Sequence, residues 1–71
     1  MDSQEYLKKL GKKIRQLRRI EGDTQALFAE KCGCDRVTLI RIEAGEVNTS
    51  IGLLCDIAAV LKIEIGELVT L

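Results

Sequence analysis

Seventy-one residues are enough for one domain with a single small hydrophobic core, near the size at which burial only just outweighs chain entropy. Hydrophobic residues make up 46% of the chain, but it has one Phe, one Tyr and no Trp, so the core must be aliphatic and no base-stacking platform is expected. Eleven basic and eleven acidic residues give a formal charge of zero, which excludes a uniformly polycationic molecule.

The first predicted element is an amphipathic helix over residues 3–20. The absence of Pro and the many Leu, Ile, Ala and Lys residues favour helix throughout the chain. Apolar residues recur here at spacings of three and four: Leu7, Leu10, Ile14 and Leu17. This spacing marks the buried stripe of a helix, and Gly22 is expected to end it.

Two short helices follow with a very short connection. Thr24 is the expected N-cap of the segment "QALFAEKC", which ends at Gly33. Four of its residues are available to the core: Leu27, Phe28, Ala29 and Cys32. Asp35 is the N-cap of a third helix through about Ala44, closed by Gly45. Two short helices joined by a tight, Gly-containing turn cross steeply, so residues 24–44 form a helix-turn-helix in the physical sense.

The last two predicted helices complete the fold. Ser50 caps a helix over residues 51–61, and Ile65, Leu68 and Val69 indicate a short fifth one. No strand alternation, repeat or linker is present. We therefore predict one all-α domain over residues 1–71, a compact five-helix bundle.

Charge is distributed unevenly along the chain. Residues 1–20 carry seven Lys or Arg against two acidic residues, a net of +5, whereas residues 42–71 carry five acidic residues against Lys62, a net of −4. Residues 1–20 could therefore bind an anion while residues 42–71 face away from it. A solvated helix surface explains the same pattern equally well.

The third predicted helix has an unusual outer face. At about 100° per residue, four side chains fall within an arc of about 140°, and they are Arg36, Val37, Ile40 and Arg41. Leu39 and Ile42 point the opposite way and must face the core. Two arginines and two aliphatic residues suit a DNA major groove, where Arg binds guanine O6 and N7 and an aliphatic group contacts a thymine methyl. An equally good alternative is that neighbouring elements partly cover Val37 and Ile40 and that the two arginines pair with nearby acidic residues.

The segment "TQALFAEKCGCDRVTLIRIEAGE" resembles the helix-turn-helix of the phage repressor and Cro (XRE-type) family of transcriptional regulators. The similarity runs from "LGKKIRQLRR" through "IAAVL" to "GELV", which is nearly the whole chain. It implies a lambda-repressor-like DNA-binding domain in which Arg36, Val37, Ile40 and Arg41 read bases. These are the four residues that the helical wheel leaves free.

The resemblance also implies roles outside the third helix. Thr24 and Gln25, at the start of the second helix, and Asn48, in the following loop, contact DNA phosphates. Arg18 and Glu43 form a structural ion pair between the first and third helices. Lys62 departs from the family pattern by replacing a common Gly. Ile40 stands where a small or polar residue is frequent, so it either contacts a thymine methyl or reduces the capacity for base hydrogen bonds.

The three cysteines do not predict a metal or redox site. Cys32 takes a core aliphatic position and Cys34 the apolar position inside the turn, so both are expected to be small buried hydrophobes. A structural zinc site needs four ligands, whereas the chain has no His and only Cys55 as a third thiol. We expect neither metal nor cofactor. Redox sensing would require an exposed thiolate with a lowered pKa.

The fourth helix predicts a partner. Ile51, Leu54, Ala58 and Leu61 form one apolar stripe, and further residues widen the apolar arc to about 220°. Either the fifth helix or a second copy of the chain covers the extra surface. We expect a two-fold homodimer through Leu53, Ile57, Val60 and Ile65. It would place two reading helices about 34 Å apart on a near-palindromic operator.

The predicted function is therefore that of a sequence-specific regulator of transcription that binds double-stranded DNA. The chain ends where the fold ends, so no ligand domain is expected; a phage regulator, a restriction-modification controller and an antitoxin partner all fit. The alternative is a protein-interaction module with the same fold. An enzyme is not expected, because there is no His and no nucleophile-base pair.

No apolar run approaches the ~18 residues of a membrane span, and no signal peptide is evident, so we expect a cytoplasmic protein.

Overall fold

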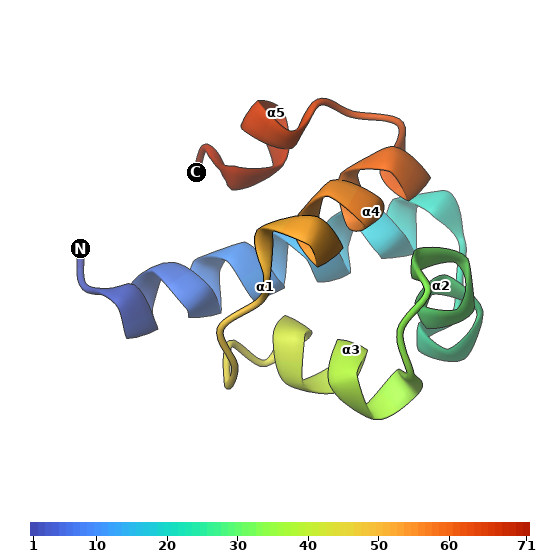
Figure 1. The fold of residues 1–71 in the computed structure, drawn as a ribbon, viewed down its shortest axis with the longest axis horizontal. Helices are drawn as coiled ribbons and strands as arrows, with labels where there is room; N and C mark the ends of the chain where they lie inside the picture. The colour runs from blue at the N-terminus through green and yellow to red at the C-terminus, as the bar shows by residue number, and fades with distance from the viewer.

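The computed structural model describes residues 1–71, which fold into five helices and no strand, as predicted. The helices are α1 (Ser3–Glu21), α2 (Gln25–Cys32), α3 (Arg36–Glu43), α4 (Ile51–Leu61) and α5 (Ile65–Val69). The long α1 runs through the middle of the molecule; α3 lies on one side of it and α4 and α5 on the other, with α2 near its C-terminal end (Figure 1). None of these helices has the length and apolar character needed to cross a membrane.

A short polar side chain begins four of the five helices. Asp2, Thr24, Asp35 and Ser50 each accept a hydrogen bond from the backbone N–H three residues later. The caps predicted at Thr24, Asp35 and Ser50 are thus confirmed. Each such bond satisfies one of the unpaired N–H groups of a helix start and contributes about 1 kcal/mol.

The helix ends follow the prediction with small shifts. Gly22 and Gly33 take the left-handed conformation after α1 and α2, but α1 extends to Glu21 rather than Ile20, and α3 ends at Glu43 with Ala44 as its C-cap. Lys62 follows α4 with φ of 60° and is the one non-glycine residue with positive φ. The Gly that is common in the family at this position would adopt that conformation without the steric cost of a Cβ atom.

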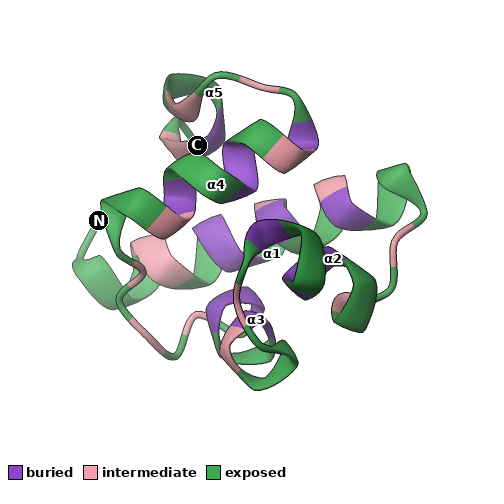
Figure 2. Cartoon of the chain, turned by 45° about the vertical axis from the view of Figure 1, so that its right-hand side comes forward, coloured by how far each residue is buried: buried purple, intermediate pink, exposed green.

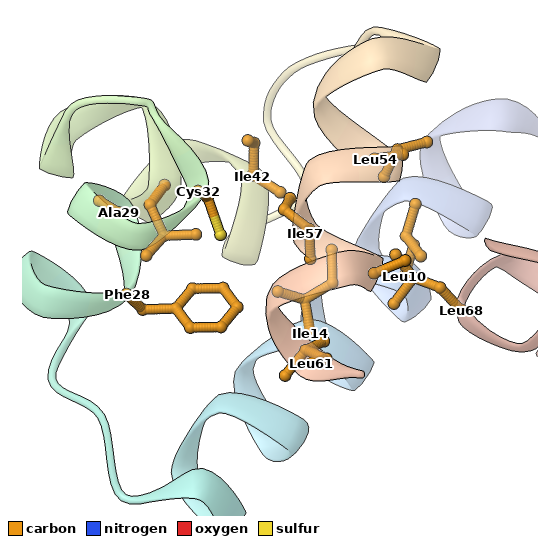
Figure 3. Close-up of a cluster of buried hydrophobic side chains, with 12 residues drawn as sticks. Leu10, Ile14, Phe28, Ala29, Cys32, Ile42, Leu54, Ile57, Leu61 and Leu68 are labelled. Atoms are coloured by element: carbon orange, nitrogen blue, oxygen red, sulfur yellow. The ribbon is translucent and has the colours of Figure 1, made fainter. Parts of the chain in front are cut away.

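The core is aliphatic around a single aromatic ring. Phe28 points from α2 into a cluster formed with residues of α1, α3, α4 and α5 (Figure 3). The largest fully buried side chains are Phe28, Ile14, Leu39, Ile57 and Leu68. Two predicted core residues are instead exposed, Leu27 on α2 and Ile51 at the first position of α4. For Ile51, the stripe of α4 that faces the core begins one turn later, at Leu54.

Gly11 lets α1 and α3 approach closely. A Cβ atom at Gly11 would lie 2.6 Å from the carbonyl oxygen of Glu43 and closer still to that of Ile42. Both are backbone atoms at the end of α3. Contact between α1 and α3 therefore depends on a residue without a side chain.

The short α5 is attached to α1 through its own carbonyl groups. Tyr6 donates its hydroxyl hydrogen to the carbonyl oxygen of Val69 at 2.5 Å. The Lys13 ammonium donates to the carbonyl oxygens of Glu67 and Thr70, the latter at 2.7 Å. These bonds satisfy carbonyl groups that a helix C-terminus leaves unpaired, and they fix α5 against α1.

Candidate nucleic-acid interface

The outer face of α3 carries the four residues that the helical wheel leaves free. Arg36 and Arg41 are exposed, and the aliphatic side chains Val37 and Ile40 are 57% and 37% exposed. On the opposite face, Leu39 is fully buried and Ile42 is only 3% exposed. Figure 2 shows this division, with the inner side of α3 buried and its outer side open to solvent. The structure therefore brings the four predicted base-reading residues together on one free surface.

The turn before α3 fixes where this face begins. The Cys34 N–H donates to the carbonyl oxygen of Ala29 at 3.0 Å, and Gly33 has φ of 78°. Asp35 then accepts from the Thr38 N–H at 2.7 Å. Hydrogen bonding to Thr38 holds the pKa of the Asp35 carboxyl below its usual value. An ionised carboxylate at the N-terminus of a helix also interacts favourably with the helix dipole.

A buried polar network joins α1, α2 and α3. Arg18 and Glu43 form an ion pair with Nε 2.7 Å from Oε2, and their side chains are only 8% and 3% exposed. A second Arg18 nitrogen donates to Glu43 at 3.1 Å, and a third donates to the carbonyl oxygen of Asp23 at 2.9 Å. The Gln25 amide donates to Glu43 at 3.1 Å. The pair implied by the resemblance is therefore present, and no buried side-chain nitrogen or oxygen is left without a partner.

A basic hollow of about 500 Å³ opens at the start of α2. It is lined by Arg15, Arg18, Arg19, Thr24, Gln25, Ala26 and Arg36. The first N–H groups of α2 have no partner within the helix, and they add positive charge to that of the arginines. Thr24 uses its hydroxyl oxygen to cap α2, which leaves the hydroxyl hydrogen free to donate. Arrangements of this kind bind phosphate.

The arginines Arg15 and Arg19 were not among the predicted site residues. Arg15 also lines a second, smaller hollow with Gln25, Ile40, Glu43 and Ala44. It therefore lies between the start of α2 and the outer face of α3. The net charge of +5 over residues 1–20 signalled a basic first helix, but only the packing of α1 against α2 and α3 shows which of its residues lie there.

Asn48 lies away from Thr24 and Gln25. It is exposed in the loop after α3 and lines a hollow with residues from the start of α1, including Ser3, Gln4 and Lys8. The three predicted phosphate-contacting residues thus lie beside α3 in two places, with Thr24 and Gln25 at the start of α2 and Asn48 in the loop after α3.

The three thiols have different environments, and all are free. Cys32 is buried, and burial raises its pKa from the ordinary 9.0 to about 11. Cys34 is half-buried rather than buried as predicted, because the turn leaves one side of it open to solvent; its pKa is raised, also by burial. Cys55 is exposed on α4. No group of three or more His, Cys, Asp or Glu side chains is placed to hold a metal ion.

We expect alkylation to follow these environments. At pH 8, iodoacetamide should modify Cys55 first and Cys32 last, because the thiolate is the nucleophile and burial suppresses it. Peptide mass spectrometry over a time course measures the order. Equal rates at Cys32 and Cys55 in the folded protein would contradict this placement.

Because unfolding returns Cys32 to an ordinary pKa near 9.0, its contribution to stability is complete below pH 9 and decreases as the pH rises through about 11.

The predicted dimer surface is only partly available. Leu53, Val60 and Ile65 are half-buried, since they pack against the core cluster and remain partly exposed on α4 and α5. Ile57 is fully buried in the core of the single chain, so its assignment to an interface is wrong. Ile57 lies three residues after Leu54 and four before Leu61, so it shares the face of α4 that packs on α1 and α2.

The comparisons with known proteins agree with this geometry. The family model described as "Helix-turn-helix" matches residues 14–68. The structure is similar to that of the restriction-modification controller protein C.AhdI from Aeromonas hydrophila, with a TM-score of 0.89 and 34% identity over 96% of this chain and 99% of that chain.

It is also similar to a hypothetical transcription factor, NHTF, from Neisseria, with a TM-score of 0.87 and 26% identity over 99% of this chain and 80% of that chain. No curated protein sequence gives a significant match. The chain belongs to the helix-turn-helix family of phage repressor and Cro-like (XRE-type) regulators, and it is a DNA-binding transcriptional regulator.

Proposed function

We propose that this protein is a homodimeric regulator of the restriction-modification controller type that binds a near-palindromic operator in the cytoplasm. One observation carries the proposal, namely that α3 exposes Val37 and Ile40 between Arg36 and Arg41 while its opposite face is buried. If the outer face of α3 contacted only water, two exposed aliphatic side chains on it would bring no advantage. A major groove offers methyl groups to these two and guanine acceptors to the arginines.

Phosphate contacts on both sides of α3 would set its orientation in the groove. At the start of α2, Thr24 and Gln25 lie beside the free N–H groups of that helix. The Gln25 amide group is held by Glu43, which leaves one of its two hydrogens to donate to a phosphate. Asn48 is exposed in the loop that follows α3. Such contacts fix the register of the protein on the duplex without reading sequence.

The dimer is proposed through the apolar side chains that remain open on α4 and α5, those of Leu53, Val60 and Ile65. These helices lie across α1 from the reading helix (Figure 1). A two-fold interface formed there would leave both copies of α3 free. The two helices would enter successive major grooves about 34 Å apart, which requires two related half-sites.

Selection of bound duplexes from a random pool, at near-physiological salt, tests the proposal. We expect enrichment of a near-palindrome with half-sites about one helical turn apart. Analytical ultracentrifugation of the same sample measures whether the free protein is a dimer. Absence of any enrichment by folded protein would overturn the proposal and favour an interaction module that uses the apolar surface of α4 and α5.

Arg41→Ala should weaken binding to the selected operator by roughly 1–3 kcal/mol, because the alanine side chain cannot form the bidentate hydrogen bonds to guanine. Binding to unrelated duplex should change little. Titrations of both duplexes by fluorescence anisotropy measure the difference. An equal decrease on both would assign Arg41 to phosphate, since phosphate contacts do not depend on sequence.

A further inference from the structure

The basic residues of α1 fall into two groups. Lys13 and Arg18 are used inside the chain, where they bind α5 and α3. The second group is exposed and forms no side-chain hydrogen bond or ion pair within the chain. Four of its members share one face of the helix, and we call them the α1 basic row: Lys8, Lys12, Arg15 and Arg19.

The spacing of the row is that of a single helical face. Successive members are four, three and four residues apart, which places them within an arc of about 60°. Eleven steps of about 1.5 Å extend the row over roughly 16 Å. No acidic residue occurs in α1 between Leu7 and Ile20, and neither Glu5 nor Glu21 of this helix forms an ion pair with a member of the row.

The row lies beside the elements that face DNA in the proposed complex. Arg19 lines the hollow with Thr24, and Arg15 lines hollows with both Thr24 and Ile40. At the other end, the backbone of Lys8 is so close to Gly45 that a Cβ atom there would lie 2.6 Å from the Lys8 Cα. The row therefore extends from the start of α2 to the loop that follows α3.

We propose that the α1 basic row binds phosphates of the DNA strand that borders the groove read by α3. The inference rests on the proposed function and adds a second set of contacts to those of Thr24, Gln25 and Asn48. An exposed line of unpaired cations attracts a polyanion, and each phosphate it neutralises releases a condensed counterion. Residues 51–71, which form α4 and α5 on the other side of α1, carry three acidic residues against Lys62, and this net negative charge favours approach of DNA from the side of α3.

The decisive measurement is the salt dependence of DNA binding by the double variant Arg15→Gln/Arg19→Gln. Lys9→Gln is the matched control for removal of a charge, because Lys9 is exposed and unbonded on α1 but lies about 100° from Lys8 around the helix. Binding constants would be measured from 50 to 200 mM salt on the selected operator and on an unrelated duplex. Thermal melts monitored by circular dichroism would check that the variants are folded.

We expect the slope of log K against log salt concentration to become shallower by about 0.9 for each phosphate that a variant no longer neutralises. The slope for the double variant should be shallower by about two units per bound protomer on both duplexes, and Lys9→Gln should retain the wild-type slope. The single variant Lys12→Gln should reduce the slope by about one unit.

Three results would overturn the inference. If the wild-type protein binds the operator and the double variant keeps its slope, the row does not contact phosphate, although the proposed function stands. A decrease in affinity confined to the operator would make these residues base readers instead. If the wild-type protein binds no duplex at all, both the proposed function and the row are wrong.

Discussion

Glu43→Ala should lower the free energy of unfolding by about 3–5 kcal/mol, which is the usual effect of removing one partner from a buried ion pair. Arg18 would remain nearly buried, with only the carbonyl group of Asp23 as a hydrogen-bond partner. A chain of this length has roughly 4–11 kcal/mol of stability in total, so the variant should be largely unfolded at 37 °C if the wild type lies at the low end. Urea denaturation followed by circular dichroism measures the change.

The pair between Lys31 and Asp23, whose Lys31 side chain is exposed, provides the control. Their atoms are 2.9 Å apart, close to the distance in the buried pair, but the Lys31 side chain is 47% exposed. Lys31→Ala should therefore cost less than about 1 kcal/mol. The double variant Arg18→Met/Glu43→Leu should recover much of the stability, because no unpaired charge remains. A similar cost for Glu43→Ala and Lys31→Ala would contradict the burial of the Arg18–Glu43 pair.

Gly11→Ala should destabilise the fold by about 3 kcal/mol, at the upper end of the usual range for overpacking. The added methyl group would meet the carbonyl oxygens of Ile42 and Glu43, and a backbone cannot move aside as a flexible side chain can. Relief of the clash requires α3 to move away from α1, so operator binding should also weaken. Thermal denaturation and operator titration measure the two effects.

Gly52→Ala is the matched control, since it makes the same change in α4 at an exposed position with nothing within 4 Å of the new atom. It should stabilise the protein by about 0.5–1 kcal/mol, because Ala is the better helix former. Opposite signs at the two glycines are expected. A stabilising Gly11→Ala would show that α1 and α3 do not approach as closely as described.

Local chemistry explains why the elements could be predicted from the sequence. Thr24, Asp35 and Ser50 act on N–H groups a few residues away, so their effect does not depend on the rest of the fold. The face of α4 was harder, because an apolar arc of about 220° does not indicate which side is inside. The apolar pattern therefore predicts Ile57 on a dimer surface and Ile51 in the core, whereas in the structure Ile57 is buried and Ile51 is exposed.

The exposed face of α3 could be predicted from the sequence, whereas the basic hollow beside it could not. On α3 the wheel was informative because Leu39 and Ile42 oppose Arg36 and Arg41, so the exposed face could be predicted and is confirmed. The basic hollow was not predicted, because Arg15 meets the start of α2 only through tertiary packing. The spacing of residues within one helix does not indicate how two helices that are distant in sequence approach each other.

The contact of Gly11 with α3 also bears on how such regulators diverge. The position of α3 is set by backbone carbonyls and by a buried ion pair, and none of its four outward side chains takes part. Substitutions at those positions can therefore accumulate without shifting the helix or unfolding the domain. With the base-reading role proposed for these side chains, a lineage built on this scaffold can acquire a new target sequence in single steps, each passing through a stable protein.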